Sequence, residues 1–425
     1  MKRSLLALAL LSVAFTASAQ NLLIRNAKVV AGGNAAPRDA DVLIRNGVIQ
    51  SVGNGLSSSG VTVVDANGRF VTPMLFGGIS DIGVEEVSGE RSTVDSSFAH
   101  GNTREQMEIR PEFDVTLAFN PDSILIPVAR NEGIGWTLVS AGSSGVSSIV
   151  LGQGGVVRFN GDTEAIGPRA LFLNMGEAGA SASGNSRAAQ WMILDQLIDE
   201  VQGKIGPDSR FALLTPAGRK AFSKYLAGNG RVFVGMNRAS DIRQLLKWSE
   251  RTGVKVAIVG GDEGWKVAND LARAKVPVFI NALNALPSNF DSLGTRLDNA
   301  ALLNQAGVPV SFYQSDMASH MAFKMRQIAG NAVSYGMPWQ AAFAGLTTVP
   351  AQAMGVADKV GSIAAGHPGD VVIWSGDPLE VNAIADQVIV NGRVVDMRSR
   401  HTELRDRYLK PTPNPDQGQM PRAYE

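Results

Sequence analysis

The stretch "KVAIVGGDEGWKVANDLARAKVPVFI", Lys255 to Ile280, contains a complete strand–helix–strand unit. Two short apolar runs, Lys255–Val259 and Val276–Ile280, flank a segment with apolar residues at helical spacing, Val267–Ala274. Strands joined through a helix usually pair in parallel. The same alternation predicts further strands at Trp136–Ser140, Ala170–Met175, Arg231–Gly235 and Val308–Tyr313. The central chain therefore predicts a parallel sheet, closed or open.

The two ends of the chain have a different pattern, with short β-branched runs separated by turn signals. Asn46-Gly47 and Asn391-Gly392 each lie between two such runs, and Asn-Gly there is a strong hairpin signal. The most economical fold pairs both ends into one small β-sandwich domain beside a (β/α)8 TIM-like barrel. We expect the sandwich to comprise residues 20–70 and 355–400, the barrel residues 71–354, and a polar tail residues 401–425.

Residues 1–19 have the features of a cleaved secretory signal peptide. Lys2 and Arg3 precede the apolar run Leu5–Phe15, and Ala17-Ser18-Ala19 is an A-x-A cleavage site. The apolar run is too short to span a bilayer. We therefore expect a periplasmic or secreted protein whose mature chain begins at Gln20.

Charge and cysteine content exclude several classes of function. The full chain has 39 basic and 39 acidic side chains, and cleavage of the signal peptide would leave it slightly acidic. No electrostatic signal for nucleic-acid binding is present. The chain has no cysteine, which excludes disulfides, thiolate metal sites and a cysteine nucleophile. No further stretch is apolar enough to predict a membrane span.

Two long stretches resemble a known family. "GRFVTPMLFGGISDIG", Gly68–Gly83, looks like the opening barrel strand of the amidohydrolase superfamily, in particular of its imidazolonepropionase-like branch. "AAFAGLTTVPAQAMGVADKVGSIAAGHPGDVVIWSGDPL", Ala341–Leu379, looks like the return of that family's chain into its β domain. The order of the parts is similar over almost all of the mature chain. The resemblance implies a hydrolase of C–N bonds other than those of proteolysis, acting on cyclic amides or dipeptide-like compounds.

The resemblance also implies a metal ion at the carboxyl end of the barrel. Its ligands would be two histidines on strand one, a lysine or glutamate on strand four, histidines on strands five and six, and an aspartate on strand eight. Such an ion lowers the pKa of bound water to about 7, and the aspartate handles the proton.

This sequence departs from that ligand pattern at the histidine positions. Residues two apart on a strand face the same side, so Ile79 and Asp81 stand at the two strand-one positions. Gly235 and Gly260 stand at the positions of strands five and six. Asp316 is retained at the strand-eight position. The metal motifs are thus degenerate, with vestigial ligand positions at Ile79, Asp81, Gly235, Gly260 and Asp316, and we expect no metal cofactor.

The remaining polar residues of the predicted mouth have a functional and a structural interpretation. Asp316 could be a surviving proton shuttle or a hydrogen-bonded remnant. Asp81 and Glu177 could join it in an oxygen-only site that holds a divalent cation weakly, or they could be held by amides and salt bridges. His320 could face the pocket or cap a helix. The candidate ligand-pocket residues are Asp81, Gln153, Glu177, Asn237 and His320.

Two functions follow from these residues. In the first, the protein is a non-catalytic member of the fold, a pseudoenzyme that binds a small ligand or forms a homo-oligomer, or a hetero-oligomer with an intact homologue. In the second, it is an active metal-dependent amidohydrolase with a reduced site of carboxylates. Convergence of those carboxylates on one point would favour the second hypothesis.

Overall fold

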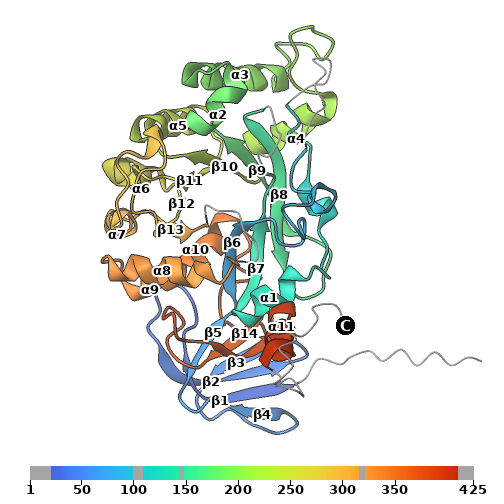
Figure 1. Cartoon of the computed structure of the whole chain (residues 1–425), viewed down its shortest axis with the longest axis vertical. Helices are drawn as coiled ribbons and strands as arrows, with labels where there is room; N and C mark the ends of the chain where they lie inside the picture. The colour runs from blue at the N-terminus through green and yellow to red at the C-terminus, as the bar shows by residue number, and fades with distance from the viewer. Residues whose placement is uncertain (1–20, 99–108, 143–147, 315–320, 410–425) are drawn as a thin grey trace, which may run out of the picture.

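The computed structural model describes residues 21–98, 109–142, 148–314 and 321–409. Two eight-stranded sheets organise this part of the chain: an almost closed barrel, and a separate sheet domain below it in Figure 1. The predicted fold class, a TIM-like barrel beside a small β domain, is confirmed. Within the described residues, no helix is both long and apolar enough to cross a membrane.

The sheet domain combines strands from both ends of the chain. Its order is β16-β15-β14-β5-β1-β2-β3, and β4 also pairs with β1. Asn46-Gly47 and Asn391-Gly392 form the β2–β3 and β15–β16 turns with positive φ at both residues, which is the geometry of a type I′ hairpin. The strand bounds are β1 (Leu22–Val29), β2 (Arg38–Arg45), β3 (Val48–Gly53), β4 (Thr62–Asp65), β5 (Phe70–Pro73), β14 (Val371–Trp374), β15 (Ala385–Val390) and β16 (Arg393–Val394).

The barrel strands follow one another around the sheet in chain order. The path runs from β6 to β13 without a crossover, and every adjacent pair along it is hydrogen-bonded. The bounds are β6 (Leu75–Ser80), β7 (Ile134–Val139), β8 (Val150–Arg158), β9 (Ile166–Asn174), β10 (Arg231–Met236), β11 (Val256–Gly260), β12 (Val278–Ile280) and β13 (Val310–Phe312).

One strand of the barrel departs from the predicted parallel sheet. β8 is antiparallel to both β7 and β9, while the other neighbouring pairs are parallel. No helix lies between β8 and β9, so the chain reverses directly. The glycines of "GQGG", residues 152–155 of β8, permit this strand to lie against β7. A Cβ on Gly154 would overlap the carbonyl oxygen of Val139. The motif therefore serves close strand packing.

Helices cover the outside of the barrel on the β9–β13 side (Figure 1). α4 is capped by Thr215, whose hydroxyl accepts from the Gly218 N–H at 2.9 Å. α5 begins at Ala239 without a side-chain cap, and it ends at Gly253 in the left-handed conformation. The helices are α1 (Leu125–Asn131), α2 (Gly176–Ala180), α3 (Arg187–Val201), α4 (Pro216–Leu226), α5 (Ala239–Thr252), α6 (Ala268–Ala274), α7 (Asn299–Gln305), α8 (Lys324–Ser334), α9 (Trp339–Gly345), α10 (Thr348–Ala353) and α11 (Arg400–Leu409).

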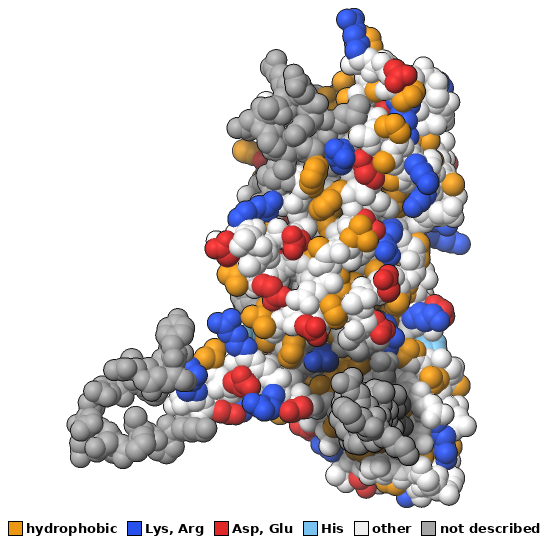
Figure 2. Space-filling model, turned by 90° about the vertical axis from the view of Figure 1, so that its right-hand side faces the viewer, with side chains coloured by type: hydrophobic (Ala, Val, Ile, Leu, Met, Phe, Trp, Pro, Cys, Tyr) orange, Lys and Arg blue, Asp and Glu red, His pale blue; other side chains and the backbone are white. Residues whose placement is uncertain are grey.

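Aromatic rings fill the interior of the barrel. Phe233 packs against Phe172 with ring centroids 5.6 Å apart and against Phe279 at 5.3 Å. Phe76 continues this row to Trp136 at 4.7 Å. The barrel is thus a packed core, and a ligand must bind at one of its ends. On the outer face seen in Figure 2, acidic and basic side chains are interspersed, without a large patch of one sign.

Candidate functional site at the barrel mouth

The carboxyl ends of the parallel strands meet at one edge of the barrel, which is the usual place of an active site in this fold. Seven of the eight barrel strands run in the same direction, and β8 alone is reversed. Polar residues stand at or just after six of these strand ends: Asp81, Asn174, Asn237, Asp262, Asn281 and Gln314. This edge is therefore the candidate site.

A pair of carboxyl groups lies at the end of β6. Asp81 is buried, with 3% exposure. Its backbone carbonyl oxygen accepts hydrogen bonds from the N–H groups of Val84 and Glu85 at 2.9 and 3.0 Å. The resulting tight turn brings Glu85 back to Asp81. Burial, the hydrogen bond with Asp81 and the negative charge of Asp81 together raise the pKa of Glu85 to about 7. The Glu85 carboxyl group therefore gains or loses its proton near neutral pH, in hydrogen-bond contact with Asp81.

The two glycines at the predicted histidine positions have very different surroundings. A Cβ on Gly235 would have Asn174 Oδ1 as its nearest neighbour, at an ordinary 3.5 Å. A Cβ on Gly260 would instead overlap Asn237 Oδ1, and Gly260 has a φ of +102°, which L side chains rarely adopt. A side chain at this β11 position is therefore strained in this backbone, and it would require the Asn237 amide to move. The strand-one position Ile79 is buried and pairs with Leu138 of β7.

Glu177 lies in the first turn of α2, directly after β9. Its N–H donates to Asp291 Oδ2 at 2.6 Å, and Asp291 is in turn paired with Arg187 at 2.6 Å. These contacts fix the backbone of Glu177. The Oε2 atom of Glu177 is buried and has no hydrogen-bond partner among the described residues. Since a buried polar atom without a partner is costly, this oxygen is available to a ligand or a proton.

Asp262 follows β11 and is a candidate that the sequence-based prediction did not include. Asp262 is buried, with 8% exposure. Burial raises its pKa, with a smaller contribution from Glu263, although hydrogen bonds from Asn284 and Thr295 oppose the shift. Asp262 and Asn281 line a cavity of about 10 Å³, roughly the size that one water requires. Its position one glycine after the strand end was the signal that could have identified it.

Gln153 and Asn237 are both occupied by contacts within the protein. Gln153 on β8 accepts a hydrogen bond from the Tyr225 hydroxyl at 2.9 Å, and both side chains are buried. Burial raises the pKa of Tyr225, so it remains a donor. Asn237 accepts from the Asp262 N–H at 3.4 Å and fills the space beside Gly260. The structure therefore places Asn237 in contact with Asp262, and Glu85 in contact with Asp81.

The described residues do not fit the imidazole-rich metal centre that the family implies. In the described part of the chain, no three His, Asp or Glu side chains form a group that could hold a metal ion. His367 lies in a turn 3.2 Å from the Ser362 hydroxyl, and His401 is exposed on α11. Asp316, His320 and His100 lie outside the described residues. Because these residues do not form such a centre and a side chain at Gly260 would be strained, no catalytic step is assigned to a metal.

Sequence and structure comparisons both find similarity to amidohydrolases. The sequence model of the Amidohydrolase family matches residues 244–395. Amidohydrolase tasK of Hapsidospora irregularis is 36% identical over 100 residues, which are 24% of this chain and 10% of that protein. A dihydroorotase of Trichlorobacter lovleyi is 33% identical over 86 residues, which are 18% of this chain and 20% of that protein. The matched stretches thus span a tenth and a fifth of these relatives.

The fold is similar to the crystal structure of an amidohydrolase from Thermotoga maritima. The TM-score is 0.77, and the alignment covers 89% of this chain and 100% of that one, at 23% identity. This barrel, with a sheet domain built from both chain ends, defines an amidohydrolase-type fold. Together with the family-model match over residues 244–395, this fold shows that the chain is similar to members of the amidohydrolase superfamily.

Proposed function

We propose that this protein is an exported, non-catalytic amidohydrolase-fold protein, which binds a small amide-like ligand at the barrel mouth or acts as a partner subunit of an intact homologue. The observation that carries the proposal is Gly260. The position where the family resemblance places an imidazole has a left-handed φ, and the Asn237 side chain takes up its Cβ space. An imidazole ligand there would require the backbone of β11 to change.

The other candidate ligand positions support the same proposal. Ile79 and Gly235 offer no side-chain ligand, and a zinc site needs at least three good protein ligands. The Asp81 side chain is hydrogen-bonded to Glu85, and the Glu177 backbone is held by Asp291. The mouth nevertheless keeps buried polar groups, including Glu177 Oε2. Such groups favour hydrogen-bond recognition of an amide without its hydrolysis.

The proposal predicts a protein with little zinc and no turnover. The purified mature protein is expected to hold well under one equivalent of zinc by elemental analysis. It should not hydrolyse cyclic amides or dipeptides after zinc is added, while isothermal titration with the same compounds detects binding. One tightly held zinc per chain, with turnover that Asp316→Asn abolishes, would show instead that the protein is an active enzyme.

A second candidate function is an active hydrolase with a carboxylate site. The observation in its favour is the Asp81–Glu85 pair, because a carboxyl group with a pKa of about 7 can exchange protons near neutral pH. Asp81, Asp316 and Glu177 would then hold magnesium or calcium, which prefer oxygen ligands. Turnover that depends on added magnesium and is lost in Asp81→Asn would favour this function over the first.

Glu85 also gives a pH dependence of stability whose sign follows from its raised pKa. Between the unfolded value near 4.5 and the folded value of about 7, the native state binds more protons than the unfolded state, so stability falls as pH rises through this window. Glu85→Gln removes the titration. We expect it to raise the free energy of unfolding at pH 8 by about 1–2 kcal/mol relative to wild type, after allowance for solvent screening.

Chemical denaturation of both proteins at pH 5 and pH 8 measures this effect. The matched control is Glu380→Gln, which removes an exposed carboxylate of the connection between β14 and β15. It should leave the difference between the two pH values unchanged. An equal pH dependence of stability in wild type and Glu85→Gln would contradict the raised pKa of Glu85.

A further inference from the structure

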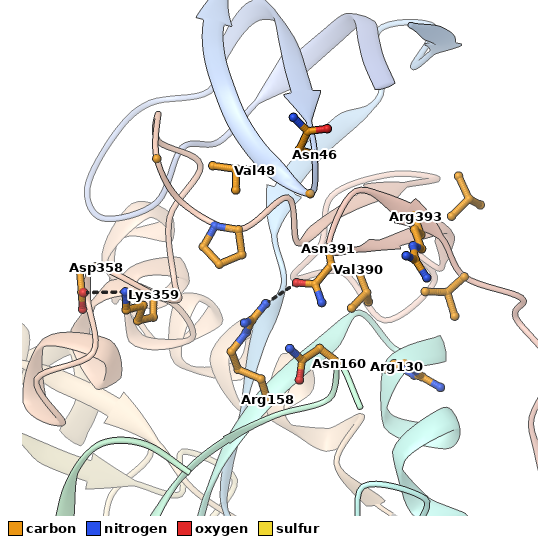
Figure 3. A pocket seen from close by; sticks show the side chains of 15 residues that line it. Asn46, Val48, Arg130, Arg158, Asn160, Asp358, Lys359, Val390, Asn391 and Arg393 are labelled. Carbon is orange, nitrogen blue, oxygen red and sulfur yellow. Dashed lines mark hydrogen bonds and ion pairs between the residues drawn. The ribbon is translucent and has the colours of Figure 1, made fainter. Parts of the chain in front are cut away.

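A second cavity lies at the opposite end of the barrel from the mouth. Its volume is about 700 Å³, and it opens between the sheet domain and the barrel (Figure 3). The barrel contributes Arg130 of α1, which precedes β7, and Arg158 at the end of the reversed strand β8. The sheet domain contributes residues of its two Asn-Gly hairpins, among them Val48 and Arg393. Hairpins from the N-terminal and C-terminal parts of the sheet domain thus line the cavity together with the barrel.

The lining of this cavity is strongly cationic. It includes Arg130, Arg158, Lys359 and Arg393, whereas Asp358 is its one acidic residue. Lys359 lies 3.4 Å from Asp358, so these two charges offset each other.

The three arginines differ in how their charges are matched. Arg158 is held by Asp370 at 2.6 Å and by Asn391 at 2.8 Å. Arg130 and Arg393 form no ion pair with a carboxylate of the described residues. Arg130 donates only to the Phe159 carbonyl oxygen, at 3.4 Å. Two cations of the cavity therefore remain without a counter-charge.

Arg130 carries an additional energetic cost. Its Nε atom is buried without a hydrogen-bond partner in the described part of the chain. Burial lowers the pKa of the Arg130 guanidinium, with no carboxylate acting in the opposite direction. A partly buried cation without a counter-ion is unfavourable, and a bound anion would relieve that cost.

We propose that this interdomain cavity is a binding site for a small, multiply charged organic anion, recognised through carboxylate or phosphate groups by Arg130 and Arg393. A guanidinium can bind either group with two parallel hydrogen bonds. The Asn160 amide is occupied by Asp162, and Asn391 Oδ1 accepts from Arg158. Val390 and Val394 provide an apolar wall. Arg158 is a fixed structural member, because Asp370 and Asn391 already hold it. The site is independent of the barrel mouth and of the function proposed there.

Binding of two probes tests the proposal and separates the possible sources of the charge. Citrate represents carboxylates and pyrophosphate represents phosphates, each titrated calorimetrically into the full mature protein at low ionic strength. We expect at least one probe to bind with a dissociation constant below about 1 mM. Arg393→Gln should weaken that binding at least tenfold, and Arg393→Lys, which keeps the charge, should weaken it less. Arg393 is exposed, so both variants should fold.

Two comparisons make the test decisive. Arg273→Gln removes a cation of α6 that is 77% exposed and lies outside the cavity, and it should bind the probe like wild type. Arg130→Gln should weaken binding as Arg393→Gln does. The proposal is overturned if neither probe binds with a dissociation constant below about 1 mM, if Arg393→Gln weakens binding less than tenfold, or if Arg273→Gln loses as much affinity as Arg393→Gln.

Discussion

Gly260→His is expected to destabilise the barrel strongly, whereas Gly235→His is expected to have a smaller effect on its stability. Both variants restore an imidazole at a position where the family resemblance places one, but only Gly260 has a positive φ, +102°. A side chain there costs about 1–3 kcal/mol in backbone strain. Overlap with Asn237 Oδ1 adds about 1–3 kcal/mol of overpacking. The sum is a large part of the 5–15 kcal/mol that stabilises a typical native protein.

Soluble yield and the midpoint of thermal unfolding measure this difference. The Gly235→His protein should lose less stability than the Gly260→His protein, because the nearest neighbours of its Cβ are at ordinary contact distance. The double variant Gly260→Ala with Asn237→Gly separates the two costs, since it removes the overlap and keeps the backbone strain. A Gly260→His protein as stable as Gly235→His would refute the structural reason for the missing imidazole, and with it the main support for a non-catalytic protein.

Arg158→Met is expected to reduce the free energy of unfolding by about 2–3 kcal/mol, less than the 3–5 kcal/mol found for fully buried pairs. Arg158 ends β8 in the barrel, and Asp370 precedes β14 in the sheet domain, so their 2.6 Å contact joins the two parts. The side chains are only 12% and 16% exposed. Asp370 also accepts from the Asn391 N–H at 2.7 Å. Removal of the arginine leaves this mostly buried carboxylate without its counter-charge.

A surface pair of the same length provides the control for this prediction. Arg251 and Asp195 also lie 2.6 Å apart, but their side chains are 60% and 46% exposed. Arg251→Met should therefore change stability by less than about 1 kcal/mol. The double variant Arg158→Met with Asp370→Asn should recover part of the lost free energy of unfolding, because it removes the unpaired charge of Asp370. Equal effects of Arg158→Met and Arg251→Met in urea denaturation would exclude the proposed role of the interdomain pair.

Much of the fold was predictable because local signals and tertiary structure agree. Each strand–helix unit of the barrel was visible as a change in hydrophobic period, as in Lys255–Ile280, now β11, α6 and β12. Asn46-Gly47 and Asn391-Gly392 adopt the left-handed conformations that their hairpins require. One expectation was wrong. The sheet was expected to be wholly parallel, but β8 is reversed.

The candidate site was predicted less completely than the fold. Asp81 was identified from its place on the first barrel strand, but its partner Glu85 was not, because a turn of the backbone brings them together. Asp262 was missed for a related reason, since its raised pKa depends on burial. The assignment of Gln153 to a ligand pocket stays a prediction, and the structure adds that Tyr225 occupies its amide oxygen. Asp316 and His320 also remain predictions, because they lie outside the described residues.

The sequence alone determined which chemical groups are present at each strand end. It showed that Ile79, Gly235 and Gly260 stand where the family resemblance places imidazoles, because residue identity and strand periodicity require no coordinates. Only the tertiary structure decided which of these positions is strained by a side chain. It also decided which carboxyl group has its pKa raised by a neighbour, and where arginines lie together without an ion-pair partner. These properties depend on distances through space between residues far apart in the chain, such as Arg130 and Arg393, and no local pattern encodes such distances.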